Sequence, residues 1–371
     1  MKGGIPMAQS RNLGIDMLRI VSMIMVVMLH VLGQGGILET VKPFSCNYLI
    51  ANFFETLSYG AVDCFAIISG YVGVDSQFRY SNIVTLWRKV FFYTITIAGV
   101  SILVNPHNVS INLINQAIFP VLTSHYWYFT AYFGLFFFIP FINRFVNSLN
   151  KKEMDQCTVA VLLFFSLIPT VSNHSLFYIN GYSIIWLAIC YYIGAYIKKR
   201  SLVHLLSNKK SLMCLVFWGC IALTYFSVLL NDFIYPQTSW STEDTYLNYT
   251  SPTVLISSII IVLYFANLHL HEHTAKIVKT LSPLAFNVYI IHCNVVVWNL
   301  LSKRFAAYAN ISPVLFVLFL ILSVSGIYAV CSAIDLIREA IERKLDLKHK
   351  IDHAVENKLL LIKDYMKQRM T

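Results

Sequence analysis

The sequence predicts an all-α protein, a polytopic bundle of transmembrane helices. Of its 371 residues 57% are hydrophobic and only 12% are charged, whereas a soluble domain usually carries about 25% charged residues. Hydrophobic stretches also recur along the whole chain with only short polar gaps between them. The length alone would suggest two or three soluble domains, but this pattern favours one membrane-embedded unit.

Ten stretches have about the 17–25 residues that a helix needs to cross a bilayer. In chain order they are 13–33, 47–72, 83–104, 126–145, 155–172, 182–197, 212–230, 252–269, 284–301 and 313–337, of which the fifth and sixth are short. We interpret the first as an uncleaved helix rather than a signal peptide, because its apolar run is long, contains Arg19 and His30 and lacks a clear small-residue cleavage site. We therefore expect about ten spans.

The basic residues predict the orientation of these spans. If the N-terminus is cytoplasmic, 24 of the 28 Lys and Arg residues fall on cytoplasmic segments and only Lys42, Lys303 and Arg304 fall outside. Cytoplasmic loops are the ones enriched in Lys and Arg, so both termini are expected in the cytoplasm. The net charge of +10 is then an orientation signal, and no nucleic-acid partner is needed to explain it.

We expect two regions, a membrane domain over residues 1–337 and a basic tail over 338–371. Apolar residues in the tail recur at three-, four- and six-residue steps between charged ones, which favours an amphipathic helix on the inner leaflet; docking against a partner helix is the alternative. The eight cysteines show no close pairing. They are interpreted as small apolar residues rather than as disulfides or a metal site.

The first span carries the strongest functional signal. Arg19 and His30 are eleven residues apart, about three helical turns, so they share one helix face and lie about 16 Å apart along its axis. Asp16 precedes Arg19 by three residues and is its expected ion-pair partner. Ionisable groups inside a membrane are costly and therefore suggest a functional site. The alternative is that Arg19 reaches the headgroups and His30 lies at the far interface.

Polar groups in three further spans are candidates for the same site. Asp63 and Ser69 lie in the second span; a buried acid needs a cation or hydrogen bonds, and Arg19 is an available partner. Close helix packing is the alternative role for Ser69 and the neighbouring Gly70.

Aromatic residues and a second histidine complete the candidate set. Trp127 and Tyr128 open the fourth span, where aromatic residues form either an interfacial belt or a stacking surface for a sugar. Tyr289 and His292 lie in the ninth span. His292 is a possible second histidine of a central cavity, with a purely structural role as the alternative.

These phrases together resemble the acyltransferase-3 family of membrane O-acyltransferases. The resemblance spans roughly residues 11–337 and rests on Arg19 and His30 separated by ten residues, on VDCFAIISGYV in the second span, on Trp127-Tyr128, and on Tyr289-Ile-Ile-His292. The chain departs from the family in having Arg79 and then only Arg88-Lys89 after the second span, where members often have a denser arginine cluster with a nearby proline.

The resemblance implies transfer of an acyl group, expected to be acetyl, from cytoplasmic acyl-CoA to a hydroxyl of a surface polysaccharide or its lipid-linked precursor. No bound cofactor or metal is expected, and acetyl-CoA is a co-substrate. His30 suits a general base near neutral pH, and Arg79, Arg88 and Lys89 suit the CoA phosphates. A bacterial cell membrane is the expected location. The alternative function is a non-catalytic glycan or solute transporter lined by the same charges.

Overall fold

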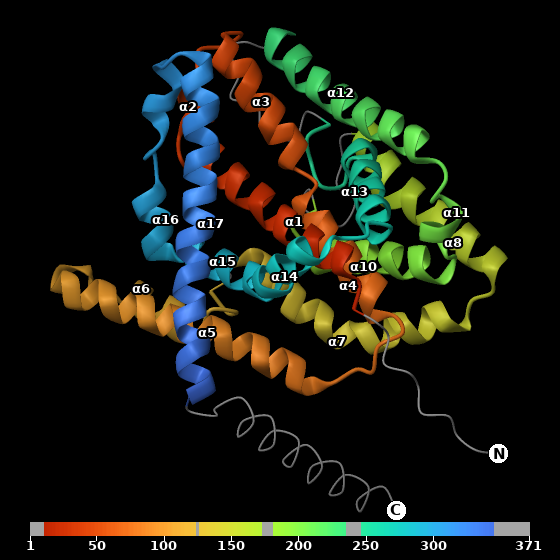
Figure 1. Cartoon of the computed structure of the whole chain (residues 1–371), viewed down its shortest axis with the longest axis horizontal. Coiled ribbons are helices and arrows are strands. Elements are labelled where there is room, and N and C mark those ends of the chain that lie inside the picture. The colour runs from red at the N-terminus through yellow and green to blue at the C-terminus, as the bar shows by residue number, and fades with distance from the viewer. Residues whose placement is uncertain (1–10, 124–125, 173–180, 235–245, 345–371) are drawn as a thin grey trace, which may run out of the picture.

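The computed structural model describes residues 11–123, 126–172, 181–234 and 246–344, and every regular element in them is a helix. The all-α prediction is therefore confirmed. Helix α1 (Leu13–Leu32) runs through the middle of the molecule (Figure 1). It packs against α3 (Cys46–Ser58), α4 (Ala61–Gly73), α13 (Pro252–Ala266), α14 (Glu272–Leu281), α15 (Ala285–His292) and α17 (Pro313–Lys344).

The remaining helices surround this centre. Along the lower edge of Figure 1 lie α5 (Tyr80–Val104), α6 (Ile111–Ile118) and α7 (Trp127–Ser148), while α12 (Lys210–Ile234) forms the upper right edge. The others are α2 (Ile37–Thr40), η1 (Pro106–Asn108), α8 (Lys151–Leu162), η2 (Leu163–Leu167), α9 (Ile168–Ser172), α10 (Ile184–Lys199), α11 (Leu202–Leu205), η4 (Ser282–Leu284), α16 (Val295–Leu301) and η5 (Ala306–Asn310).

Six helices in the described residues are long and apolar enough to cross a membrane, or up to seven if one sharply bent pair counts as a span. The expected count of about ten is not confirmed, because several predicted spans are short or broken. The stretch 47–72 divides into α3 and α4, each of 13 residues, and α10 and α13 have 16 and 15 residues. α4 and α10 are largely buried within the bundle, so other helices cover them.

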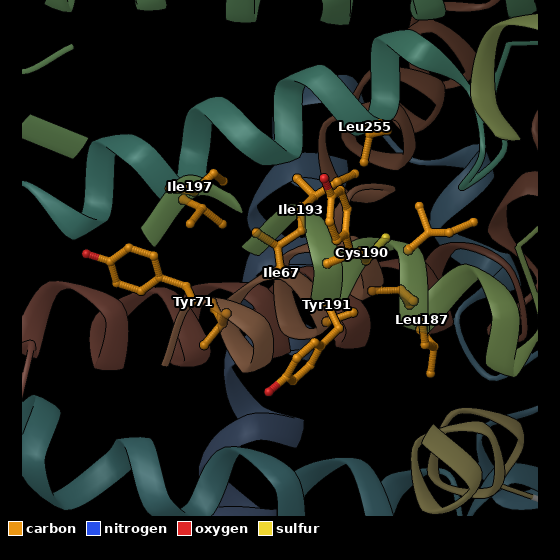
Figure 2. Close-up of a cluster of buried hydrophobic side chains, with 14 of the residues drawn as sticks. Ile67, Tyr71, Leu187, Cys190, Tyr191, Ile193, Ile197 and Leu255 are labelled. Carbon is orange, nitrogen blue, oxygen red and sulfur yellow. The ribbon is translucent and has the colours of Figure 1, made fainter. Parts of the chain in front are cut away.

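Two glycines allow α4 and α10 to cross in direct backbone contact. A Cβ atom at Gly70 would lie 1.8 Å from the carbonyl oxygen of Tyr191, and one at Gly194 would lie 1.9 Å from that of Ile67. Small residues permit such close approach between membrane helices. Figure 2 shows the apolar cluster that forms around this crossing, with side chains from α4, α10 and α13. The packing role for Gly70 is therefore the one the structure supports.

A buried ion-pair network joins α17 to α5 and α15. Asp335 accepts hydrogen bonds from Tyr93 Oη of α5 at 2.6 Å, from Asn287 Nδ2 of α15 at 2.6 Å and from Arg338 Nε at 2.6 Å. Arg338 also pairs with Glu342 at 2.8 Å. A buried carboxylate is tolerated when paired and hydrogen-bonded in this way, so the network fixes α15 against its neighbours.

The same network changes the expected boundary of the tail. Arg338 is only 4% exposed and belongs to α17, which continues to Lys344 without interruption at residue 337. The rest of the predicted amphipathic tail, residues 345–371, lies outside the described part of the chain.

Substitution of the crossing glycines should destabilise the bundle. Gly70→Ala and Gly194→Ala each force a methyl group into a backbone carbonyl, and such overpacking typically costs about 1–3 kcal/mol. Gly219→Ala on α12 and Gly326→Ala on α17 are matched controls, because no atom of the described part of the chain lies within 4 Å of their added Cβ atoms. We expect thermal unfolding in detergent at lower temperature for the first pair only. Equal melting temperatures for all four variants would contradict the close crossing.

The orientation predicted from the basic residues can be measured by cysteine labelling. The exposed Cys46 and Cys214 are first replaced by serine. Asn115→Cys on α6 and Glu243→Cys, the latter outside the described part of the chain, should then react with an impermeant thiol reagent added outside intact cells. In the predicted orientation both positions lie outside, because 24 of the 28 basic residues fall on the segments assigned to the cytoplasm. Leu205→Cys should react only after the cells are opened. Labelling of position 205 from outside intact cells would contradict the predicted orientation.

Candidate functional site

The acidic group at the start of α1 holds two arginines. Asn12 caps the helix by accepting a hydrogen bond from Ile15 N at 3.1 Å, which places Asp16 in the first turn. Asp16 Oδ1 pairs with Arg19 Nη1 at 2.6 Å and accepts a bond from Ser282 Oγ at 3.2 Å, while Oδ2 pairs with Arg11. The expected Asp16–Arg19 ion pair is present, and it uses only part of the donor capacity of a guanidinium.

Three cavities meet at Arg19. The basal cavity, about 660 Å³, is lined by Arg11, Asp16, Arg19, Tyr71, Lys198, His269 and neighbouring residues. The side cavity, about 310 Å³, lies between α4, α5 and α7 and includes Arg19, Ser69, Arg79, Asn143 and Tyr191. The central cavity, about 260 Å³, extends along α1 and includes both Arg19 and His30. One helix face thus connects a cationic region to an imidazole.

Aromatic side chains form most of the remaining wall of the central cavity. Trp127, Tyr128 and Tyr132 of α7 line it from one side, and Tyr289 of α15 and Tyr249 line it from others. Trp127 stacks against Tyr249 with ring centroids 5.9 Å apart and planes inclined by 28°. Such a wall is suited to the faces of a sugar ring or to an acyl chain. The cavity therefore combines one guanidinium, one imidazole and apolar aromatic surface.

His30 and His292 contact each other at one end of this cavity. His30 Nδ1 lies 2.9 Å from His292 Nε2, and His292 Nδ1 lies 2.6 Å from the carbonyl oxygen of Val288. His292 is fully buried, whereas His30 is partly exposed and lines the cavity. Trp298 of α16 packs its ring against His30 in an edge-to-face arrangement with centroids 4.7 Å apart. The two histidines that the sequence singled out are thus brought together.

A break in the helix after His292 makes this contact possible. The chain bends by 77° between the segments 272–292 and 295–310. Asn294 caps α16 by accepting from Val296 N at 3.1 Å and donates to Tyr126 Oη at 3.0 Å. Tyr126 in turn donates to the carbonyl oxygen of Ile290 at 3.0 Å, so its hydroxyl joins both sides of the break. Broken helices inside a membrane protein are tolerated where protein surrounds them and re-satisfies the backbone.

Asp63 does not contact Arg19, which corrects the partner expected from the sequence. Trp186 Nε1 donates to Asp63 Oδ1 at 2.8 Å, and Cys190 Sγ lies 3.7 Å from the same oxygen. Both partners belong to α10. On α4, Val62, Phe65 and Ser69 face the central cavity, while Asp63 shares the opposite face with Gly70 at the α10 crossing. Helix periodicity therefore places Asp63 on the side of α4 that packs against α10.

The three basic residues after the second predicted span occupy different surroundings. Arg79 lines the side cavity. Arg88 instead pairs with Glu342 of α17 at 3.4 Å, and Lys89 lies within electrostatic range of the same α17 network, with Asp335, Glu339 and Glu342 attracting it and Arg338 repelling it. Of these three, Arg79 is the one whose side chain reaches a cavity shared with Arg19.

Cys293 lies next to the histidine pair, with Sγ 3.5 Å from His30 Nδ1 and 3.4 Å from His292 Nε2. The three ligand atoms are within 4.8 Å of one another, which is close enough to surround an ion. However, the 2.9 Å separation of the two ring nitrogens is the length of a hydrogen bond. The two rings are therefore described as a hydrogen-bonded pair, and none of the cysteines in the described residues forms a disulfide.

Sequence reasoning missed several residues of the site. Tyr132 lies one turn after Tyr128 and was detectable from that i, i+4 spacing, but Tyr249 and Phe286 of the cavity wall had no such signal. Tyr126 and Asn294 were also missed, because their bond joins segments 168 residues apart. Of the residues singled out, Arg19, His30, Ser69, Trp127, Tyr128 and Tyr289 line the central cavity, Arg79 the side cavity, and His292 lies behind His30.

Comparison with known proteins assigns the family. Residues 12–332 match the family described as an acyltransferase domain, which is the acyltransferase-3 family. No curated protein and no solved structure matches the chain. The matched region contains α1 with Arg19 and His30, the α4 wall, the opening of α7 and the broken helix with Tyr289 and His292. The chain therefore belongs to the acyltransferase-3 family of membrane acyltransferases.

Proposed function

We propose that the protein transfers an acyl group, acetyl in the simplest case, from acyl-CoA to a hydroxyl of a cell-surface polysaccharide or its lipid-linked precursor. The observation that carries the proposal is the central cavity, which connects Arg19 to His30 along one face of α1. Such a cavity can hold the polar part of acyl-CoA near Arg19 and its reacting carbonyl near His30, two positions that are about 16 Å apart along the helix. The match to an acyltransferase domain supports this function and gives no support to the transporter alternative.

The donor enters from the cationic end. Arg11 and Lys198 line the basal cavity and Arg79 lines the side cavity, and both cavities meet at Arg19. Phosphate groups of CoA are favourable partners for these cations, because charge-assisted hydrogen bonds are stronger than neutral ones. Arg88 is paired with Glu342 of α17, and neither Arg88 nor Lys89 is among the residues that line the three cavities, so Arg79 takes the leading role in this proposal.

His30 acts as general base in the transfer. It accepts the proton of the acceptor hydroxyl while the oxygen attacks the thioester carbonyl, and the carbon–sulfur bond then breaks. The thiolate leaves and takes the same proton from the imidazolium, so the products are an ester and free CoA thiol. No other reactant is required. Arg19, held by Asp16, positions the polar part of the donor where the cavities meet.

The acceptor meets the aromatic wall. Trp127 and Tyr249 present stacked rings at the central cavity, and aromatic faces are apolar surfaces that suit one face of a pyranose. A bacterial cell membrane, in which surface polysaccharide precursors and cytoplasmic acyl-CoA meet, is the location proposed with this activity. The six to seven apolar helices support a multi-pass protein.

Loss of the imidazole should abolish most of the activity. General-base assistance typically contributes about 10²–10⁴-fold in rate, so His30→Ala should lose at least about 10²-fold. His30→Gln should fail similarly, since an amide retains hydrogen bonding but takes up no proton. Arg19→Lys should also be impaired, because an ammonium does not reproduce the planar guanidinium. The measurement is incorporation of labelled acetyl from acetyl-CoA into glycan, with variants at matched membrane levels.

His204→Ala is the matched control for that experiment, because His204 is exposed on α11 and lines none of the three cavities. Its activity should equal that of the wild type. Near-normal transfer by His30→Ala would exclude His30 as the base.

Arg79→Ala should weaken donor binding. A charged hydrogen bond contributes about 1.5–3 kcal/mol when buried, and we expect about 1–2 kcal/mol here because Arg79 is exposed, a loss of roughly 5–30-fold in affinity. Calorimetric titration with acetyl-CoA measures this. Arg304→Ala removes an exposed cation after α16 and should leave the affinity unchanged. If Arg88→Ala lost more affinity for acetyl-CoA than Arg79→Ala, the phosphates would be assigned to Arg88 and Lys89 instead.

A further inference from the structure

The hydrogen bonds around His292 define which of its nitrogens carries a proton. Its Nδ1 lies 2.6 Å from the carbonyl oxygen of Val288, and a carbonyl oxygen can only accept. Nδ1 is therefore the protonated nitrogen. His292 is fully buried, and no carboxylate of the described residues bonds to it, so the ring is neutral. Its Nε2 then presents a lone pair.

The tautomer of His292 sets that of His30. His292 Nε2 lies 2.9 Å from His30 Nδ1, and a lone pair on the first nitrogen requires a proton on the second. A neutral His30 consequently has its remaining lone pair on Nε2. His30 lines the central cavity and keeps partial exposure there, and Nε2 is the nitrogen of its ring that His292 leaves available to a substrate.

We propose that His292 is a positioning residue that holds His30 in the tautomer whose Nε2 accepts the substrate proton. This inference rests on the proposed acyl transfer and adds a role for a side chain that does not itself touch substrate. The arrangement runs from the Val288 carbonyl through His292 to His30. It is comparable in logic to the carboxylate that orients the histidine of a Ser-His-Asp triad, but the orienting group here is a neutral imidazole fixed by a backbone carbonyl.

The location of His292 also favours the charged form of His30 during the reaction. When Nε2 takes up the hydroxyl proton, His30 becomes an imidazolium that still donates Nδ1–H to His292 Nε2. His292 is the last residue of α15, where the carbonyl end of the helix dipole is negative and stabilises a nearby cation. His292 keeps its own proton throughout, and the proton on Nε2 passes to the leaving thiolate.

The surroundings hold both rings in this arrangement. Tyr126 bonds to the carbonyl of Ile290 and to Asn294 on either side of the break, which fixes the end of α15. Trp298 packs on the ring of His30. His292 is not among the residues that line the central cavity, and both of its nitrogens are engaged. It is therefore placed to orient His30 rather than to act as the base itself.

The first test compares two substitutions in the full-length protein in membranes. The amide of His292→Gln reaches the position of the lost Nε2 and offers an oxygen that accepts from His30 Nδ1–H. His292→Leu has similar volume and no acceptor. We expect kcat for acetyl transfer to fall by about 10–10²-fold in the leucine variant, with KM for acetyl-CoA within about twofold, and to recover to within about fivefold of wild type in the glutamine variant.

Recovery by glutamine separates an orienting role from a merely structural one, because leucine fills the space equally well. Wild-type kcat in His292→Leu would overturn the proposal, as would equal losses in the two variants. A metal ion bound at one equivalent, found by elemental analysis, together with inactivation in Cys293→Ser would also overturn it, because a ligated pair makes no ring-to-ring hydrogen bond.

A second measurement reads the tautomers without relying on activity. In protein with ¹⁵N-labelled histidine in nanodiscs, single substitutions assign the ring signals of His30 and His292. Both residues should show protonated Nδ1 and unprotonated Nε2 in the wild type, and His30 should become a mixture of tautomers in His292→Leu. An Nε2-protonated His30 in the wild type would refute the inference. If wild-type protein transfers no acyl group while these signals are as expected, the proposed function fails and the pairing of the histidines stands.

Discussion

The cost of placing ionisable side chains inside an apolar bundle is the constraint on which the structure of the site depends. The buried carboxylate of Asp16 is stabilised by ion pairs with Arg19 and Arg11 and by a hydrogen bond that it accepts from Ser282. These contacts come from α1, from the residue preceding its cap and from η4. Because an unpaired buried carboxylate would be far less stable, these segments are held together, and Arg19 is fixed where the three cavities meet.

Close backbone contact decides which face of α4 reaches the site. Gly70 and Gly194 let α4 and α10 approach until carbonyl oxygens would touch any added Cβ. The crossing buries the face of α4 that carries Asp63. The partners of Asp63 are therefore Trp186 and Cys190 of α10. The neighbouring face, with Ser69, is left for the cavities. A packing constraint therefore separates one polar group from the site and supplies another to it.

The position of His292 depends on interactions from distant parts of the chain. Asn287, five residues before it, bonds to Asp335 of α17 at 2.6 Å, and Tyr126 bonds across the break that follows it. Arg88 also joins the α17 network through its ion pair with Glu342. The basic residues at and after the start of α5 are thus divided, with Arg79, just before the helix, at a cavity and Arg88 in a structural ion pair.

The sequence by itself determined the helical class, the Asp16–Arg19 pair and the shared face of Arg19 and His30, because each follows from composition or from helix periodicity within one segment. The family resemblance was also visible at that level and agrees with the match over residues 12–332. Residues linked by local spacing, such as Tyr128 and Tyr132, are accessible in the same way.

Only the tertiary structure decided the partner of Asp63, the division between Arg79 and Arg88, and the contact of His30 with His292. Each depends on which helices are neighbours and at what rotation, and α1 and α15 meet across 262 residues of sequence. The number of spans was likewise not fixed by hydropathy, because α10 and α13 are as apolar as longer helices but are only 16 and 15 residues long. Packing geometry, rather than local composition, sets these features, because these side chains are buried by, and form their hydrogen bonds with, residues of other helices.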